Sequence, residues 1–245
     1  TPMAAKIRNK KFSFPVSTLI GSPYANFKEV MDGRDTRGHR SRYHFTKGVS
    51  WILEWFRLVE ERKYGKVIEE KTIDKPPIFI IGFWRSGTTI LHNLMCENPD
   101  FGFVNTFQTV FPNHCLLNQG WLRAAASVLV PEKRPGDNVK FDFTYPQEEE
   151  FALGNMQPLS FYNMFYFPQD TEEFIREALY FEDISDEQFQ HWRSAYFTAI
   201  KTALISTKGK QFVSKNPPNT FRIPQLLEMF PDAKFIYIHR DMHET

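Results

Sequence analysis

The stretch from Ile78 to Thr89 constrains the fold of this chain more than any other. It begins with β-branched and aromatic residues typical of a buried strand and continues through a turn bounded by Gly82 and Gly87. Apolar residues then recur at helical spacing, which predicts a helix that starts near Thr88. Backbone N–H groups converge where such a helix begins, and the helix dipole adds partial positive charge there. The stretch therefore predicts an anion-binding loop.

The residue types in this loop differ from those of a nucleotide hydrolase. Gly82 and Gly87 keep the G-x-x-x-x-G spacing of a P-loop, but Thr88 stands where a nucleotide hydrolase needs lysine. The only cation in the loop is Arg85. A phosphate- or sulfate-binding loop is therefore favoured over a plain tight turn, and a P-loop kinase or NTPase with a degenerate loop stays as the alternative function.

Strand and helix signals alternate along the rest of the chain. This alternation predicts an α/β fold of the P-loop type, with three α/β/α layers and a central parallel sheet, and with ligands at the carboxyl ends of the strands. Further strands are expected at Phe101–Thr106, Gln211–Ser214 and Lys234–Ile238. Helices are expected at 121–130, after Pro146, after the Ser185–Gln188 capping box, and at 220–230.

Three loops leave the carboxyl ends of these strands, and each carries positive charge. They are 82–89 with Arg85, 215–218 with Lys215, and 239–241 with Arg240. A nucleotide hydrolase would need an acidic residue at such a strand end to hold Mg²⁺. The pattern therefore indicates a metal-free clamp for a nucleotide with phosphates at two separate places.

The N-terminal region, residues 1–70, is predicted to be a helical extension packed on a main domain of residues 71–245. Within it, 49–61 shows apolar residues at helical spacing, which are expected to pack on the main domain. A helix lying on a membrane surface is the less favoured alternative, because the polar face is not rich in lysine. The apolar positions are Val49, Ile52, Leu53, Trp55, Phe56 and Val59.

Composition excludes several classes of protein. The 30 basic residues nearly cancel the 29 acidic ones, which argues against nucleic-acid binding through net charge. The sequence contains no run of 18 apolar residues, so no membrane-spanning helix is predicted. Cys96 and Cys115 are the only cysteines and form no disulfide framework, so a reducing compartment, the cytoplasm, is expected. The histidines show no metal-ligand spacing, so no metal site is predicted.

Four motifs in order resemble the sulfotransferases that use 3′-phosphoadenosine 5′-phosphosulfate (PAPS), in the broad branch with an arginine-type loop. The resemblance covers about Pro76 to Thr245 and implies a PAPS co-substrate. Its marks are Arg85-Ser86-Gly87-Thr88-Thr89, Pro146-x-Glu148-Glu149-Glu150-Phe151-Ala152-Leu153, Lys215-Asn216-Pro217-Pro218, and Phe235-Ile236-Tyr237-Ile238-His239-Arg240-Asp241.

The resemblance implies roles for individual residues of the donor site. Arg85 matches the catalytic cation that stabilises the bridging oxygen as sulfur leaves, and Arg240 matches the arginine that holds the 3′-phosphate. The family usually completes this last contact with a serine further on, which would lie beyond Thr245, so the domain is expected to continue past that residue. The cradle of the 5′-phosphate is matched by Ser86, Gly87, Thr88 and Thr89.

The general base is less clearly implied. Many members carry Lys-Thr-His after the matching strand, whereas here Lys215 is kept and Pro217 occupies the place of the histidine. Other branches use a glutamate, and the acids after Pro146 would supply it. Glu148, two residues after the proline, is favoured as the base over Glu149 and Glu150, and Glu149 is the second candidate catalytic carboxylate. The alternative is that these acids only stabilise a helix N-terminus.

The implied reaction is in-line transfer of the sulfuryl group to a small-molecule or lipid-like hydroxyl, with Arg85 and Lys215 stabilising the departing phosphate. The aromatic and Met-rich segment Met156–Phe167 favours an apolar alcohol such as a sterol or lipid. A non-catalytic nucleotide-binding relative of the family is the third alternative.

Overall fold

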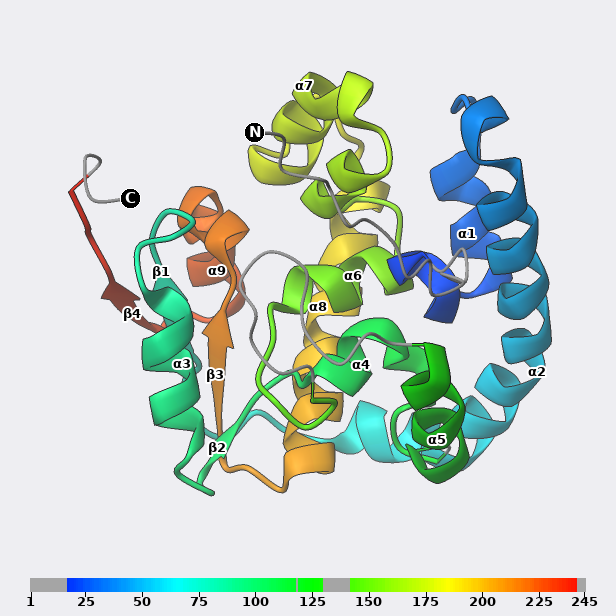
Figure 1. The fold of residues 1–245 in the computed structure, drawn as a ribbon. Coiled ribbons are helices and arrows are strands. Elements are labelled where there is room, and N and C mark those ends of the chain that lie inside the picture. The colour runs from blue at the N-terminus through cyan, green and yellow to red at the C-terminus, as the bar shows by residue number, and fades with distance from the viewer. Residues whose placement is uncertain (1–16, 118, 130–141, 242–245) are drawn as a thin grey trace, which may run out of the picture.

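The computed structural model describes residues 17–117, 119–129 and 142–241 (Figure 1). Residues 1–16 of the predicted extension, Val130 at the end of a predicted helix, and the last four residues lie outside these ranges. The α-helices are α1 Tyr24–Met31, α2 Arg40–Glu70, α3 Thr88–Cys96, α4 Thr106–Val110, α5 Gln119–Leu129, α6 Glu149–Met156, α7 Thr171–Phe174, α8 Asp186–Thr207 and α9 Ile223–Met229. The strands are β1 Ile78–Ile81, β2 Phe101–Gly102, β3 Gln211–Lys215 and β4 Lys234–Tyr237.

The strands form a parallel sheet in the order β2-β3-β1-β4, which confirms the predicted α/β class with a central parallel sheet. Most of the chain is helical around this small sheet (Figure 1). β1 lies in the middle because its residues are the most apolar of the four strands, and Phe79 and Ile80 are almost fully buried.

Helices cover both faces of the sheet, and successive side chains of β3 point toward opposite faces. Ser214 lies on the face covered by α8, where it shares a hydrogen-bond network with Tyr196. Lys215 lies on the opposite face, where its charge acts on the buried His92 of α3. The layers therefore bring helix N-termini and polar side chains to the carboxyl edge of the sheet.

The N-terminal helices share the hydrophobic core of the rest of the chain. Leu19 and Phe27 belong to the same buried cluster as Phe79 of β1 and Leu153 of α6. A second cluster joins Leu53 of α2 to residues of α4 and α5. The described part of the N-terminal region is therefore held by burial of apolar surface against the sheet-bearing part.

The prediction that the apolar residues of α2 pack on the main domain is correct for Val49, Leu53 and Phe56, which contact a buried cluster with α4 and α5. It is wrong for Ile52, Trp55 and Val59, which are exposed. The helix also buries polar residues, including Ser50 and Glu60. Glu60 can be buried because its carboxylate accepts hydrogen bonds from backbone N–H groups in the segment before α5. Periodicity identified the helix, but not which face the core would cover.

Two other elements differ from their predicted ranges for local reasons. The predicted strand at 101–106 is shorter, because Asn105 leaves the sheet and caps α4 by accepting a hydrogen bond from Gln108 N at 2.9 Å. The predicted helix at 220–230 begins as a 3₁₀ turn, Pro217–Phe221, before α9. Within the described ranges, no helix has the length and apolar character needed to cross a bilayer.

Candidate active site

The loop between β1 and α3 has the backbone geometry of a tight anion-binding turn. Gly82 (φ 147°) and Gly87 (φ 99°) both lie in the region that L side chains avoid, and Gly87 is the N-cap of α3. A Cβ at Gly82 would lie 2.5 Å from the carbonyl oxygen of Ile238, so β4 and the loop approach too closely for any side chain. Arg85 adopts φ 70°, an unfavourable value for a residue with a side chain.

Polar contacts hold the loop in place. Ser86 Oγ donates to the carbonyl of Phe83 at 2.7 Å inside the turn. Gly82 N–H donates to Oγ1 of Thr220 at 3.0 Å, and that hydroxyl lies 3.2 Å from the carbonyl of Gly82. Thr220 belongs to the turn after β3, so the segments that follow β1 and β3 are tied together directly.

The sheet register brings the three predicted cationic loops to one edge. Ile80 is opposite Lys215 and Ile81 is opposite Tyr237, so the chain leaves all three strands at the same level. Arg85 and Arg240 are exposed, and neither forms an ion pair with a described residue. The site residues predicted for the donor cradle, Ser86, Gly87, Thr88 and Thr89, all lie in the loop and first turn of α3.

Glu148 lies at this edge as the N-cap residue of α6. Its Oε1 accepts from Nζ of Lys215 at 2.5 Å, and its Oε2 accepts from the hydroxyl of Tyr162. The side chain of Lys215 is 2% exposed and that of Glu148 is 11% exposed, so the pair lies at the boundary between core and solvent. Lys215 has three N–H donors, so two remain for other acceptors.

Glu149 occupies a different, fully enclosed position. Its carboxylate accepts from Tyr196 at 2.7 Å and from Asn219 at 3.1 Å, and also from Ser214. Burial raises the pKa of Glu149, although the hydrogen bonds from Ser214 and Tyr196 oppose that shift. This second predicted catalytic carboxylate therefore joins α6 to β3 and α8 inside the protein.

Glu150 is paired with Arg222, and neither side chain is exposed. The guanidinium contacts the two carboxylate oxygens at 2.6 and 3.0 Å, and Phe161 N donates to the same carboxylate at 2.9 Å. Burial alone would raise the pKa of Glu150, but the charge and hydrogen bonds of Arg222 hold it below its ordinary value. The three adjacent acids thus have three separate environments.

Two site residues were missed from the sequence, Tyr162 and Trp84. Tyr162 donates to Glu148 and accepts from Nε1 of Trp84 at 3.3 Å, so the side chain next to Arg85 is linked to Glu148 through one hydroxyl. Burial and the nearby Glu148 raise the pKa of Tyr162 well above its usual range, which keeps the hydroxyl protonated as a donor. The aromatic segment Met156–Phe167 offered a signal for Tyr162, but nothing in the sequence singled out this residue.

Aromatic side chains surround this linkage. Phe151 and Phe165 pack on Tyr162 with ring centroids 4.6 and 5.2 Å away, and Phe165 is 61% exposed. Phe161 and Phe221 pack on Trp84. Most of Met156–Phe167 is buried, so the segment serves mainly as core and presents Phe165 to solvent beside the polar cluster.

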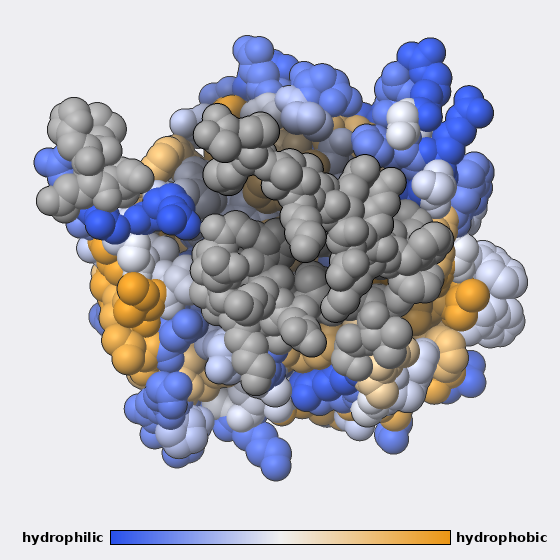
Figure 2. Space-filling model, in the orientation of Figure 1, coloured by the Kyte–Doolittle hydropathy of each residue, from blue (hydrophilic) through white to orange (hydrophobic). Residues whose placement is uncertain are grey.

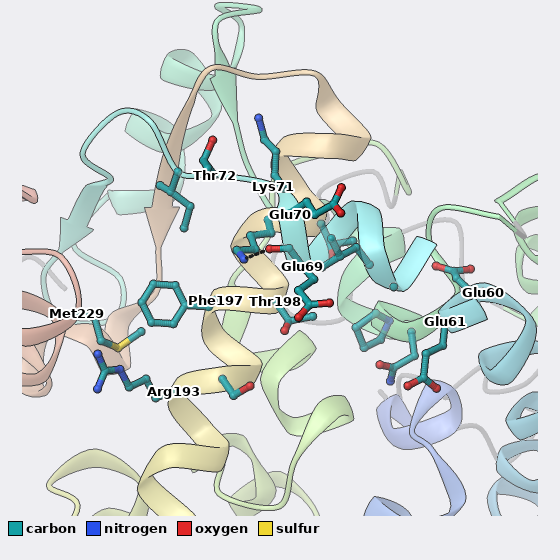
Figure 3. A pocket seen from close by; sticks show the side chains of 18 of the residues that line it. Glu60, Glu61, Glu69, Glu70, Lys71, Thr72, Arg193, Phe197, Thr198 and Met229 are labelled. Carbon is teal, nitrogen blue, oxygen red and sulfur yellow. Dashed lines mark hydrogen bonds between the residues drawn. The ribbon is translucent and has the colours of Figure 1, made fainter. Parts of the chain in front are cut away.

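A separate cleft lies away from these residues. It has a volume of about 970 Å³ and is formed by the C-terminal half of α2, the linker 71–73, α8 and α9 (Figure 3). Glu60, Glu61, Glu69 and Glu70 line it, and Lys201 donates to the backbone carbonyl of Glu69 at 2.8 Å. None of the predicted site residues borders this cleft. Among the described residues, no cluster of His, Cys, Asp and Glu could hold a metal ion.

Comparisons with known proteins agree with this geometry. Two solved structures share the fold: the sulfotransferase STF9 from Mycobacterium avium (TM-score 0.59) and the sulfotransferase STF1 from Mycobacterium tuberculosis H37Rv (TM-score 0.53). Both are 18% identical to this chain and cover 90% of it, and the matches span 63% and 62% of those proteins.

Curated relatives from Mycobacterium bovis and Mycobacterium tuberculosis are closer in sequence. Each is named omega-hydroxy-beta-dihydromenaquinone-9 sulfotransferase Stf3 and is 32% identical over 206 residues, which is 83% of this chain. The chain spans about half the length of these relatives, since the match covers 52% of each. A family model described as the sulfotransferase family matches residues 76–245, which include β1, the Arg85 loop, the glutamates and Lys215. The chain therefore belongs to the sulfotransferase family.

Proposed function

We propose that this protein transfers a sulfuryl group from PAPS to the hydroxyl of a lipid-like acceptor. The observation that carries the proposal is the linkage from the loop through Trp84 and Tyr162 to Glu148, which is itself paired with Lys215. It joins a loop suited to a phosphosulfate with a carboxylate suited to removing a proton. Family membership supports the same chemistry.

The donor would lie along the carboxyl edge of the sheet. Its 5′-phosphosulfate would take the backbone N–H groups at the start of α3 and the hydroxyls of Thr88 and Thr89, with the helix dipole favouring the negative charge. The 3′-phosphate would take Arg240, which follows β4 at the same edge and forms no ion pair with a described residue. Arg85, likewise unpaired within the described residues, would contact the bridging oxygen.

Glu148 would act as the general base. It would accept the proton of the acceptor hydroxyl while the acceptor oxygen forms a bond to sulfur and the bond from sulfur to the phosphate oxygen breaks. Arg85 and the free N–H donors of Lys215 would stabilise the charge that grows on the departing 3′,5′-adenosine bisphosphate. We assign this role to Glu148 and not to Glu149, which is 2% exposed and whose Oε1 already accepts from Tyr196, Ser214 and Asn219.

The acceptor is proposed to be an apolar alcohol. Phe165 exposes an aromatic surface beside Tyr162, and Tyr180, 48% exposed, packs at the edge of Phe221 on the Trp84 side. An isoprenoid or sterol body would lie on such surfaces while its hydroxyl reaches Glu148. The curated relatives are named for a hydroxylated dihydromenaquinone, which is a lipid-like alcohol of this class. The predicted cytoplasmic location stays a prediction.

The test is sulfate transfer from labelled PAPS to a panel of sterols, isoprenoid alcohols and sugars, followed by mass spectrometry. We expect transfer to apolar alcohols in the wild type and none in Arg85→Ala. Arg37→Ala is the matched control, because Arg37 is an exposed arginine whose ion-pair partner is its neighbour Asp35. Near-normal turnover in Arg85→Ala would refute the assignment.

Binding measurements separate the alternatives. Metal-independent binding of 3′,5′-adenosine bisphosphate supports the proposal, whereas Mg²⁺-dependent binding of ATP supports a P-loop kinase or NTPase. Binding of the bisphosphate with no transfer to any acceptor in the panel supports a non-catalytic relative.

A further inference from the structure

The solvent face of α2 carries five large apolar side chains in two helical turns, here called the α2 face. Trp55 is 67% exposed and Trp51 is 59% exposed, and the whole group has the i, i+4, i+7 spacing of one side of a helix. Figure 2 shows apolar surface over α2 at the right edge of the molecule. The members of the face are Trp51, Ile52, Trp55, Leu58 and Val59.

This face cannot turn toward the core, because the opposite side of α2 is fastened. Leu53 lies in a buried cluster, and Glu60 accepts hydrogen bonds from Leu116 N at 2.9 Å and Leu117 N at 3.2 Å. Exposed apolar surface also continues onto α5, where Trp121 is 46% exposed with its ring 4.9 Å from that of Phe56. Contiguous exposed apolar surface of this kind marks an interaction site.

Basic residues lie on α2 before and after the apolar face, whereas the acids of this helix are paired or line a separate cleft. Toward the C-terminus of α2, the same side of the helix carries the exposed basic residues Arg62, Lys63 and Lys66. More basic residues lie toward its N-terminus. On the side of the face these basic side chains are Arg40 and the half-buried Lys47 before it and Arg62, Lys63 and Lys66 after it, whereas Arg42 borders a pocket with Phe27 on the packed side of the helix.

The acids of α2 are directed away from the face or are already paired. Glu54 and Glu61 form ion pairs with Arg57, at 2.7 and 2.8 Å. Four acids, including Glu61, line the separate cleft of Figure 3. The α2 face is therefore a band of tryptophan and aliphatic side chains between two basic groups. The acids that line the cleft are Glu60, Glu61, Glu69 and Glu70.

We propose that the α2 face binds the surface of a membrane that contains anionic lipids, with α2 lying parallel to the bilayer. Tryptophan rings and aliphatic side chains enter the region between headgroups and acyl chains, where amphipathic aromatic rings are most stable. The basic groups on either side contact lipid phosphates, and their long apolar stems lie along the same surface. The helix rise places the apolar band over ~12 Å and the outermost basic residues ~39 Å apart, so both groups reach the same plane.

A second copy of the chain fits this surface less well. Because basic residues lie at both ends of α2, a parallel or an antiparallel pairing of two α2 faces places like charges opposite each other. An anionic bilayer meets both basic groups with the opposite charge. This inference concerns a surface away from the Glu148 site and does not depend on the proposed reaction.

The experiment is co-sedimentation of the whole chain with vesicles of phosphatidylcholine alone or of phosphatidylcholine and phosphatidylglycerol in equal parts. We expect binding to the mixed vesicles, weakened by added salt, with about tenfold or greater loss of affinity in Trp51→Ala/Trp55→Ala. Arg62→Glu/Lys63→Glu/Lys66→Glu is expected to lose the preference for phosphatidylglycerol, by about tenfold or more. Circular dichroism checks that each variant is folded.

The control is Ile90→Ala/Leu94→Ala, which removes two equally exposed apolar side chains from α3 and is expected to bind vesicles as the wild type does. Equal loss in this control and in the tryptophan variant would overturn the proposal, as would failure of the wild type to bind mixed vesicles. Sedimentation velocity adds a further arm: a dimer that the tryptophan substitutions convert to a monomer, without vesicle binding, assigns the face to self-association and overturns the membrane assignment.

Discussion

Replacing Arg222 by methionine removes one side of an ion pair that has no solvent exposure, and we expect it to destabilise the fold strongly. The guanidinium contacts both oxygens of Glu150, at 2.6 and 3.0 Å, and also donates to the carbonyl of Ala178 at 2.8 Å. Methionine keeps an apolar stem between Phe181 and Trp192 but supplies no donor. Most of the loss therefore comes from the charge left on Glu150.

The expected cost is about 3–5 kcal/mol of the free energy of unfolding, because a buried charge without its partner is far less stable than an exposed one. That is a large part of the ~5–15 kcal/mol that stabilises a typical domain. Urea unfolding followed by circular dichroism measures it. Arg176→Met is the matched control: its pair with Asp183 is also 2.6 Å long, but the side chains are 50% and 65% exposed. We expect a change below ~1 kcal/mol there.

The same substitution has a signed pH dependence. In the wild type the pKa of Glu150 lies below its ordinary value of 4.5, so its stabilising contribution is present above pH 4.5 and is lost as pH falls through the folded-state pKa. In Arg222→Met, burial raises that pKa, so the variant loses stability as pH rises. The difference between the two proteins should shrink on acidification from neutral pH. A cost below ~1 kcal/mol at pH 7, or one independent of pH, would refute the reasoning.

Further predictions concern single positions. Burial, with a smaller contribution from nearby positive charge, lowers the pKa of His92 from 6.5 to about 3, so its stabilising contribution is present above pH 6.5 and is lost as pH falls toward 3. Between these pH values, His92→Gln should reduce the pH dependence of the free energy of unfolding by up to ~1.4 kcal/mol per pH unit. Thermal unfolding at several pH values measures this, and an unchanged slope would contradict it. Gly82→Ala should lower the unfolding free energy by ~1–3 kcal/mol, because its Cβ meets a backbone carbonyl at 2.5 Å, whereas Gly65→Ala within α2 should be neutral or stabilising. If the proposed function holds, Tyr162→Phe should lower kcat about tenfold or more with a smaller change in the KM for PAPS, since it removes a hydrogen bond to the base; equal kcat would exclude a positioning role.

Local signals explain why much of the fold was predictable. The β1 strand, the glycine-bounded turn and the start of α3 at Thr88 follow from residues that are neighbours in sequence. The capping box before α8 is equally local: Ser185 Oγ accepts from Gln188 N at 3.2 Å, and Ser185 N donates to the Gln188 side chain at 2.8 Å. Such elements depend on backbone geometry and nearby side chains, which the sequence states directly.

The partners of the three acids at the start of α6 could not be predicted from the sequence. Glu148, Glu149 and Glu150 are adjacent, and helix geometry turns successive side chains in different directions. Their partners lie far away in sequence, with Lys215 67 residues from Glu148 and Arg222 72 residues from Glu150. Only the packing of β3 and the segments after it decides which acid meets which partner.

Local patterns in the sequence predicted an anion-binding loop around Arg85 and three cationic strand ends on a parallel sheet, and four motifs in order indicated the sulfotransferase family, to which the chain belongs. Long-range packing sets which of the three acids lies nearest the solvent, Glu148 beside Lys215. It also links Glu148 to the loop through Tyr162 and directs the tryptophans of α2 outward. Which face of a helix is buried depends on contacts with residues that are distant in sequence, so it cannot be read from the sequence of that helix alone.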